Sequence, residues 1–150
     1  MMITPFLWFD TQAEEAAQFY VSIFKNAKIT QISRYGDGRV MVVAFELDGQ
    51  KFSALNGGPM FKFNESVSFV VPCETQAEID EYWTKLTAGG GKESQCGWLK
   101  DKYGLSWQIT PANLGRLLGG PDPGKSKRAM AAMMQMKKID IAAIEAARRG

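Results

Sequence analysis

The chain has 150 residues, 45% of them hydrophobic and 23% charged, and its formal net charge is +2. This composition is ordinary for a single globular domain, and so small a net charge argues against a nucleic-acid partner. The chain contains no histidine. Its absence excludes Ser-His-Asp and Cys-His nucleophilic machinery, the HExxH zinc motif and every imidazole metal ligand.

The signals for location indicate a cytoplasmic protein with no membrane partner. The longest apolar run, "VMVVAF" at 40–45, is far too short to cross a bilayer. The start, "MMITPFLWFD", lacks the basic segment and cleavage pattern of a signal peptide. Cys73 and Cys96 form no CxxC pair, so we expect two free thiols, with Cys73 buried.

The first half of the chain predicts a β-α-β-β-β series. The aromatic-rich segment "ITPFLWF" (3–9) indicates a strand. The "TQAE" that follows pairs Thr11 with Glu14 as a capping box, which predicts a helix over 11–24. Asp48-Gly49 is typical of a tight hairpin, because both central residues of its turn need positive φ. Further strands are expected at 27–36, 40–47 and 50–56.

The second half repeats the series. "SVSFVV" (66–71) predicts a strand, and a second "TQAE" begins a helix at Thr75. The apolar stripe of that helix is expected to be Ile79, Tyr82, Trp83 and Leu86. A short strand, then "GWLKD" (97–101) and "LSWQIT" (105–110), completes the series. We therefore predict a duplicated unit within one domain, with modules of about 1–57 and 64–111.

The last segment, 112–150, is expected to be helical, with a break at "PDPG". Its methionines, clustered between 130 and 136, favour packing against the same domain or a second subunit. Its basic residues are interpreted as a solvated helix face, because Asp140 and Glu145 interrupt them and no aromatic residue interleaves.

The glycine run at 89–91 does not indicate a phosphate loop. A phosphate loop precedes its helix, whereas these glycines follow one and suit a helix C-cap. The order of elements also differs from the alternating strands and helices of a dinucleotide or S-adenosylmethionine fold.

Three stretches carry a family resemblance: "ITPFLWFDTQAEEAAQFYVSIF", "CGWLKDKYGLSWQITP" and "MAAMMQMKKIDIAAIE". They resemble the PhnB-like family, often labelled 3-demethylubiquinone-9 3-methyltransferase, of the vicinal oxygen chelate superfamily of glyoxalases, bleomycin-resistance proteins and dioxygenases. The resemblance implies an α+β fold of tandem βαβββ modules that form cupped mixed sheets, followed by C-terminal helices. It also implies a homodimer whose concave face holds a small ligand.

The chain departs from the metal-binding pattern that the resemblance implies. Metal-dependent members take ligands from four strand positions, which fall here at Gln108, near Ser66, near Asn56, and near Ile3 or Pro5. An amide, a hydroxyl and an alkyl or imide group do not suit a divalent cation. We therefore expect no metal and no other cofactor.

Strand alternation points to one polar face in the second module. Ser66 and Ser68 oppose Val67, Phe69 and Val71, and Ser106, Gln108 and Thr110 oppose Leu105, Trp107 and Ile109. Such a face either meets water on an open sheet or lines a cavity, and the resemblance favours a cavity. The predicted site is mostly uncharged, suits a neutral or weakly polar metabolite, and comprises Asn56, Ser66, Ser68, Ser106 and Gln108.

Three functions are compatible with this pattern. The first is a small-molecule-binding protein without a catalytic metal. The second is a glyoxalase-type, metal-assisted isomerase, lyase or dioxygenase, against which the missing ligands count. The third is the methyltransferase of the family label, against which the lack of an S-adenosylmethionine-binding segment counts. The sequence alone indicates no catalytic residue.

Overall fold

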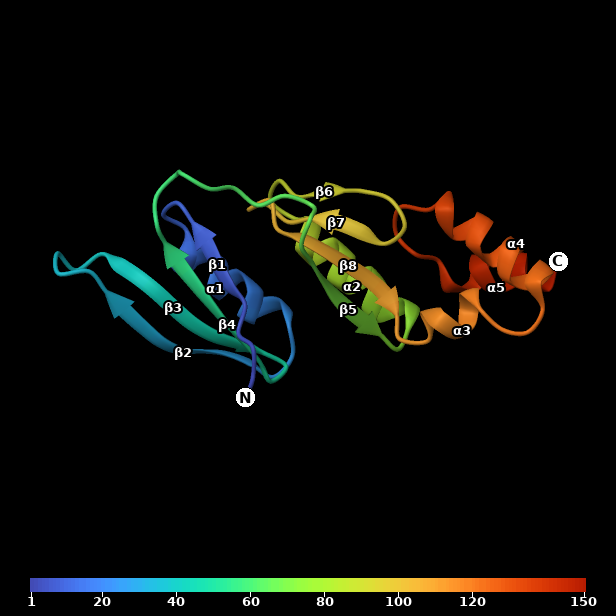
Figure 1. Ribbon diagram of the computed structural model, residues 1–150, viewed down its shortest axis with the longest axis horizontal. Helices are drawn as coiled ribbons and strands as arrows, with labels where there is room; N and C mark the ends of the chain where they lie inside the picture. The colour runs from blue at the N-terminus through green and yellow to red at the C-terminus, as the bar shows by residue number, and fades with distance from the viewer. The chain divides into compact units, whose positions relative to one another are not determined.

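The computed structural model describes all residues, 1–150, and its contacts divide the chain into two compact units, 1–63 and 64–150. Figure 1 shows the elements along the chain. The first unit contains β1 (Phe6–Phe9), α1 (Ala13–Ile23), β2 (Ala27–Arg34), β3 (Val40–Leu47) and β4 (Gln50–Asn56). The second contains β5 (Ser68–Cys73), α2 (Gln76–Thr87), β6 (Lys92–Glu93), β7 (Trp98–Lys100), β8 (Ser106–Pro111), α3 (Leu114–Leu118), α4 (Pro123–Met134) and α5 (Ile141–Arg149).

The two sheets have the same topology. The strand order is β1-β4-β3-β2 in the first unit and β5-β8-β7-β6 in the second. In each sheet the first and last strands of the series pair in parallel, and the remaining neighbours are antiparallel. The expected α+β fold of tandem βαβββ modules is thus confirmed. The module boundaries of 1–57 and 64–111 within a single domain stay a prediction.

Each sheet buries one face against its helix. In the first unit α1 lies against the side of the sheet that holds Leu7, Phe45 and Ala54, all of which are buried. In the second unit the predicted stripe of α2 is buried in full and packs toward Trp107 and Ile109 of β8. The opposite face of each sheet is left free of the unit's own helices, which is where a ligand site is expected.

The strand ends differ from the predictions by a few residues. The first strand begins at Phe6 rather than Ile3, because Pro5 has no N–H to donate to a ladder. The fifth runs from Ser68 to Cys73 rather than over 66–71, so Ser66 and Val67 precede it. Pro72 is tolerated inside this strand because β5 lies at the edge of its sheet.

The two "TQAE" segments begin their helices in different ways. At α2 the predicted cap is present, because Thr75 is the N-cap and its Oγ1 accepts a hydrogen bond from the Glu78 N–H at 3.2 Å; the return bond of a capping box, from Glu78 to the Thr75 N–H, stays a prediction. At α1 the predicted capping box is wrong: the N-cap is Gln12, and its side chain makes no capping bond. The Asn56 side chain serves this helix start instead, because its Oδ1 accepts from the Ala13 N–H at 2.8 Å.

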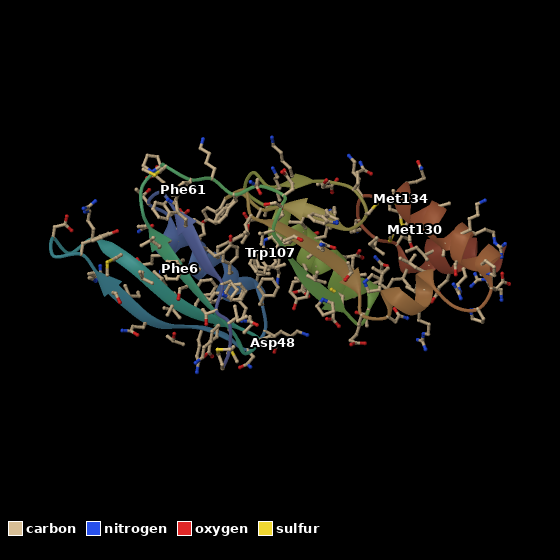
Figure 2. The ribbon with its side chains drawn as sticks, in the orientation of Figure 1. Phe6, Asp48, Phe61, Trp107, Met130 and Met134 are labelled. Atoms are coloured by element: carbon tan, nitrogen blue, oxygen red, sulfur yellow. The ribbon has the colours of Figure 1, made fainter.

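The C-terminal helices form a second apolar cluster within the second unit. Its buried members are Leu117, Ala129, Met133, Ile139 and Ile144. Gln76 of α2 anchors the segment, donating to the Ile139 carbonyl and accepting from the Ile141 N–H, both at 2.9 Å. Of the clustered methionines, Met130 and Met134 remain exposed (Figure 2). None of the helices is long and apolar enough to span a membrane.

Candidate functional site

A row of polar side chains crosses the free face of the second sheet. Residues paired across neighbouring strands share a face. Ser106 pairs with Ser68 on one side and with Lys100 on the other, and Lys100 pairs in turn with Lys92. The row therefore places two hydroxyls and two ammonium groups side by side, one from each strand of the sheet.

A cavity of about 220 Å³ opens at this row and is lined by Ser106, Lys100, Lys92 and Trp98, with Glu65, Glu93, Ser94 and Leu99. Ser106 is only 1% exposed, and its Oγ is the one buried side-chain oxygen or nitrogen of the chain without a hydrogen-bond partner. A buried hydroxyl without a partner costs roughly 1–3 kcal/mol. Such a group in a native structure calls for an explanation, and a ligand atom in the cavity supplies one.

Gln108 lies one step further along β8 on the same face. Its Nε2 donates to Ser68 Oγ at 2.9 Å, so the structure brings together three of the predicted residues, Ser68, Ser106 and Gln108. Gln108 is half-buried and flanked in register by Val70 and Trp98. This second row is largely apolar and borders the polar row.

The remaining two predicted residues lie elsewhere. Ser66 precedes β5, is exposed, and bonds to the Asn64 side chain. Asn56 belongs to the first unit and is paired with the buried Phe9, on the side of its sheet that faces α1. Its amide bonds to the Ala13 N–H and to the Val40 carbonyl. Whether Ser66 or Asn56 contacts a ligand stays a prediction.

The site is more charged than the sequence pattern suggests. Lys100 forms an ion pair with Glu65, from the segment before β5, and the hydrogen bond from Lys100 lowers the pKa of the Glu65 carboxyl below its usual value. Glu93 is the other carboxylate of the lining, and it accepts from Trp83 Nε1 at 2.8 Å. The alternation around 98–100, read with the turn at Gly104, could have indicated Lys100. Glu65 carried no such signal.

Asp101 stabilises the turn that precedes β8. The sequence pattern did not indicate a role for this residue. It is 3% exposed. Its Oδ1 accepts from the backbone N–H groups of Tyr103 and Leu105, and its Oδ2 accepts from Trp107 Nε1 at 2.9 Å. The carboxylate therefore ties the turn before β8 to the core, which holds Ser106 and Gln108 in place.

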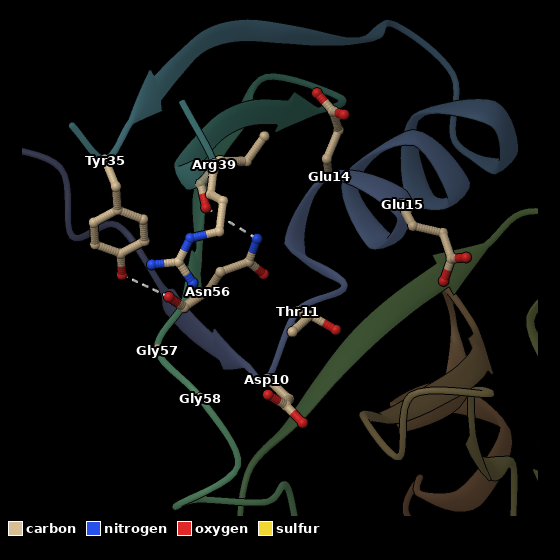
Figure 3. Close-up of a pocket in the computed structure, with 10 residues that line it drawn as sticks. Asp10, Thr11, Glu14, Glu15, Tyr35, Arg39, Asn56, Gly57 and Gly58 are labelled. Atoms are coloured by element: carbon tan, nitrogen blue, oxygen red, sulfur yellow. Dashed lines mark hydrogen bonds between the residues drawn. The ribbon is translucent and has the colours of Figure 1, made fainter. Parts of the chain in front are cut away.

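The first unit has a larger cavity, of about 730 Å³, at the start of α1 (Figure 3). Asp10, Glu14 and Glu15 line it together with Arg39. Arg39 is paired with Asp37 at 2.7 Å. Nearby, Gly57 is fixed by close approach, since a Cβ there would lie 2.4 Å from the Trp8 ring. No buried polar group without a partner points to a ligand here, so the second unit holds the stronger candidate.

The residues present do not fit the divalent cation that the superfamily pattern implies. No group of three or more His, Cys, Asp or Glu side chains is placed to hold a metal ion. Gln108 offers an amide that is bonded to Ser68, and its neighbours in the row are hydroxyls and ammonium groups. Ammonium groups repel a cation, and neutral hydroxyls are weak ligands for it.

Cys73 offers no nucleophile to either site. Its side chain is 1% exposed, as predicted, and burial, with smaller contributions from Glu78 and Glu74, raises the pKa of the thiol to about 11. The thiol therefore stays protonated at neutral pH, and only a thiolate is a strong nucleophile.

Comparisons with known proteins agree on family and fold. A family described as 3-demethylubiquinone-9 3-methyltransferase matches residues 1–110. A solved structure described as putative 3-demethylubiquinone-9 3-methyltransferase, PhnB protein, from Bacillus cereus is 38% identical, with a TM-score of 0.69, and the match covers 75% of this chain and all of that one. No curated protein matches the chain.

More distant structures share the fold alone. Protein PA1353 from Pseudomonas aeruginosa is 15% identical, with a TM-score of 0.61 over 74% of this chain and 98% of that one. The fosfomycin resistance protein FosX from Listeria monocytogenes is 16% identical, with a TM-score of 0.57 over 80% and 98%. These matches agree with the α+β fold of two similar modules.

Proposed function

The chain belongs to the 3-demethylubiquinone-9 3-methyltransferase family, and we propose that it is a small-molecule-binding protein. Its ligand binds on the free face of the β5–β8 sheet, without a catalytic metal. The observation that carries the proposal is Ser106 Oγ, which is buried in a cavity and has no hydrogen-bond partner.

The arrangement supports recognition of a compact molecule. The cavity volume of about 220 Å³ lies below the range of about 300–1,000 Å³ that is usual for drug-sized ligands. The Ser106 hydroxyl can donate one hydrogen bond and can also accept, and the Gln108 amide can orient a carbonyl or hydroxyl group from the neighbouring position. A ligand oxygen that bonds to Ser106 offsets the cost of burying its hydroxyl.

Two enzymatic alternatives make different demands of the chain. A glyoxalase-type reaction needs a metal centre, which these side chains do not fit. The methyltransferase named in the family description needs bound S-adenosylmethionine, whereas two sheets of order β1-β4-β3-β2 and β5-β8-β7-β6 lack the alternating strands and helices of the usual fold for that cofactor.

The test is a thermal-shift and native mass spectrometry screen of the purified chain against metabolites, divalent metals and S-adenosylmethionine. We expect a small metabolite to stabilise the protein. Ser106→Ala and Gln108→Leu should each weaken that ligand by about 1–3 kcal/mol, the usual cost of leaving a partner unpaired. Gln31→Leu, at an exposed strand position of the first unit, is the matched control and should bind normally.

Other results of the same screen would contradict the proposal. Stabilisation by a divalent metal with about one equivalent bound, lost on chelation, would favour the glyoxalase-type enzyme. Stabilisation by S-adenosylmethionine would favour the methyltransferase. A metabolite whose affinity is unchanged in both Ser106→Ala and Gln108→Leu binds elsewhere.

We also infer that the chain is a cytoplasmic homodimer. Large apolar side chains stay exposed on the free face of the first sheet and in the segment that follows it, among them Phe6 at 60% and Phe61 at 58%. Exposed apolar surface of this kind is typical of a protein–protein interface. The two cysteines are unpaired in the chain, as is usual in a reducing compartment.

A further inference from the structure

The polar row on the β5–β8 sheet has a definite chemical character. Reading across the strands, Ser68 and Ser106 offer hydroxyls, and Lys100 and Lys92 offer ammonium groups. Lysine carries only donors, and a serine hydroxyl can turn to donate. The row therefore presents hydrogen-bond donors, two of them cationic, and it includes Ser106 Oγ, which has no hydrogen-bond partner.

One carboxylate of the cavity lining is paired with a lysine of this row and would compete with an anionic ligand. Of the two carboxylates in the cavity lining, Glu93 accepts a bond from Trp83, and its strand partner is the buried Leu99. Glu65 is therefore the carboxylate that reaches Lys100. It comes from the segment before β5 and its side chain is 61% exposed, so it can leave without disturbing a strand.

The Glu65 carboxylate shows which kind of group Lys100 accepts at this place. Lys100 is the more enclosed partner, at 35% exposed. A ligand carboxylate that took the place of Glu65 would keep the ion pair. It could in addition accept a bond from Ser106, the strand partner of Lys100. Glu65 has no bond to Ser106, whose Oγ is without a partner.

We propose that the ligand of this site carries a small carboxylate, bound by Lys100 and Ser106, and that Glu65 occupies Lys100 until the ligand displaces it. This inference rests on the proposed function, and it replaces the expectation of a neutral metabolite. Binding exchanges an internal ion pair for an intermolecular one, so Glu65 acts as a built-in competitor.

The second row of side chains, next to the polar row, indicates the chemical character of the remainder of the ligand. Val70, Gln108 and Trp98 lie side by side next to the polar row. They suit a short apolar or aromatic body with one hydroxyl or carbonyl group for the amide to orient. The limited volume restricts the ligand to a compact monocarboxylate.

The experiment titrates the full ¹⁵N-labelled chain with matched pairs of carboxylates and their amides at millimolar concentration: acetate and acetamide, lactate and lactamide, benzoate and benzamide. The Trp98 indole and the Ser106 amide are the reporters, with Trp98 assigned by Trp98→Phe. We expect at least one carboxylate to shift both signals and to bind about tenfold tighter than its amide, because hydrogen bonds to a charged group are the stronger ones.

Three variants separate the parts of the inference. Lys100→Met should weaken the carboxylate about tenfold, and Ser106→Ala should weaken it by a similar factor. Glu65→Gln should tighten it about threefold, because an exposed ion pair that competes with the ligand is removed. Lys28→Met, an exposed lysine of β2, is the control for net charge and should change nothing. Circular dichroism confirms that each variant is folded.

Each other outcome overturns a stated part. Amides that bind as well as carboxylates, or a Lys100→Met variant that binds normally, would contradict the proposal that the ligand carries a carboxylate bound by Lys100. If Gln108→Leu still weakens those amides, the small-molecule-binding function stands. An unchanged or weaker affinity in Glu65→Gln would overturn the competitor. If no pair shifts Trp98, the inference fails, and the metabolite screen then decides the proposed function separately.

Discussion

Among single residues, a few buried polar side chains connect segments of the second unit by hydrogen bonds. Asp101 is the clearest, because one buried carboxylate accepts two backbone N–H groups and the Trp107 indole. A buried charge is tolerated only when such bonds compensate for lost hydration. The residue thereby joins the turn at 101–105 to the strand that holds the candidate site.

We predict that Asp101→Asn destabilises the fold by about 2 kcal/mol, because the new NH₂ group must face a donor at Trp107 or at the turn. Urea unfolding measures the change. Asp48→Asn is the matched control, since Asp48 sits exposed in the β3–β4 turn with φ +48°, a conformation that asparagine accepts well (Figure 2). A loss at Asp101 no larger than at Asp48 would show that the buried carboxylate contributes little.

At the scale of elements, similar sequences begin α1 and α2 but the helix starts are stabilised differently. Thr75 caps α2 with its own hydroxyl, whereas α1 receives its acceptor from Asn56 of β4. The second arrangement ties a helix to the end of the strand that pairs with β1. Contacts between elements, rather than the local motif, therefore determine where the first helix begins.

This difference predicts unequal effects of one substitution at two equivalent positions. Thr75→Ala should lower the free energy of unfolding by about 1 kcal/mol, the usual value of an N-cap. Thr11→Ala should change it by less than about 0.5 kcal/mol, as expected for an exposed residue without a capping bond. Denaturant melts of both variants decide the matter. Equal losses would mean that Thr11 caps α1 in solution.

In the whole molecule, apolar side chains stay exposed on the free faces of the sheets and in the segments beside them. In the first unit the exposed residues include Phe6, Met60 and Phe61, and in the second Val67 and Val70. The C-terminal helices contribute less to this exposed apolar surface, because most of their apolar side chains pack within the second unit.

We predict a dimer at micromolar concentration, measured by light scattering as twice the mass of the chain. Phe6→Ser should shift the equilibrium toward monomer, since it removes an aromatic side chain from the exposed sheet face. Met130→Ser, on the exposed side of α4, should leave the dimer intact. A monomeric wild-type chain contradicts the proposal, and dissociation by Met130→Ser alone would place the interface on the helices instead.

Features that depend on neighbours along the chain could be predicted from the sequence. The Asp48-Gly49 turn has positive φ at both residues, the stripe of α2 is buried as spaced, and the repeat appears as two sheets of equal strand order. Alternation along β8 likewise placed Ser106 and Gln108 on one face. Turn chemistry and side-chain periodicity are local properties, so a linear pattern expresses them.

Which of these residues lie in contact depends on the tertiary fold. The pairing of β8 with β5 and β7 places Ser106 between Ser68 and Lys100, although Ser68 and Ser106 are 38 positions apart along the chain. It also showed that Ser106 is buried without a partner, that Glu65 reaches Lys100, and that the Asn56 amide serves α1. Register between strands and the burial of a single hydroxyl depend on distant segments, and no spacing along the chain encodes them.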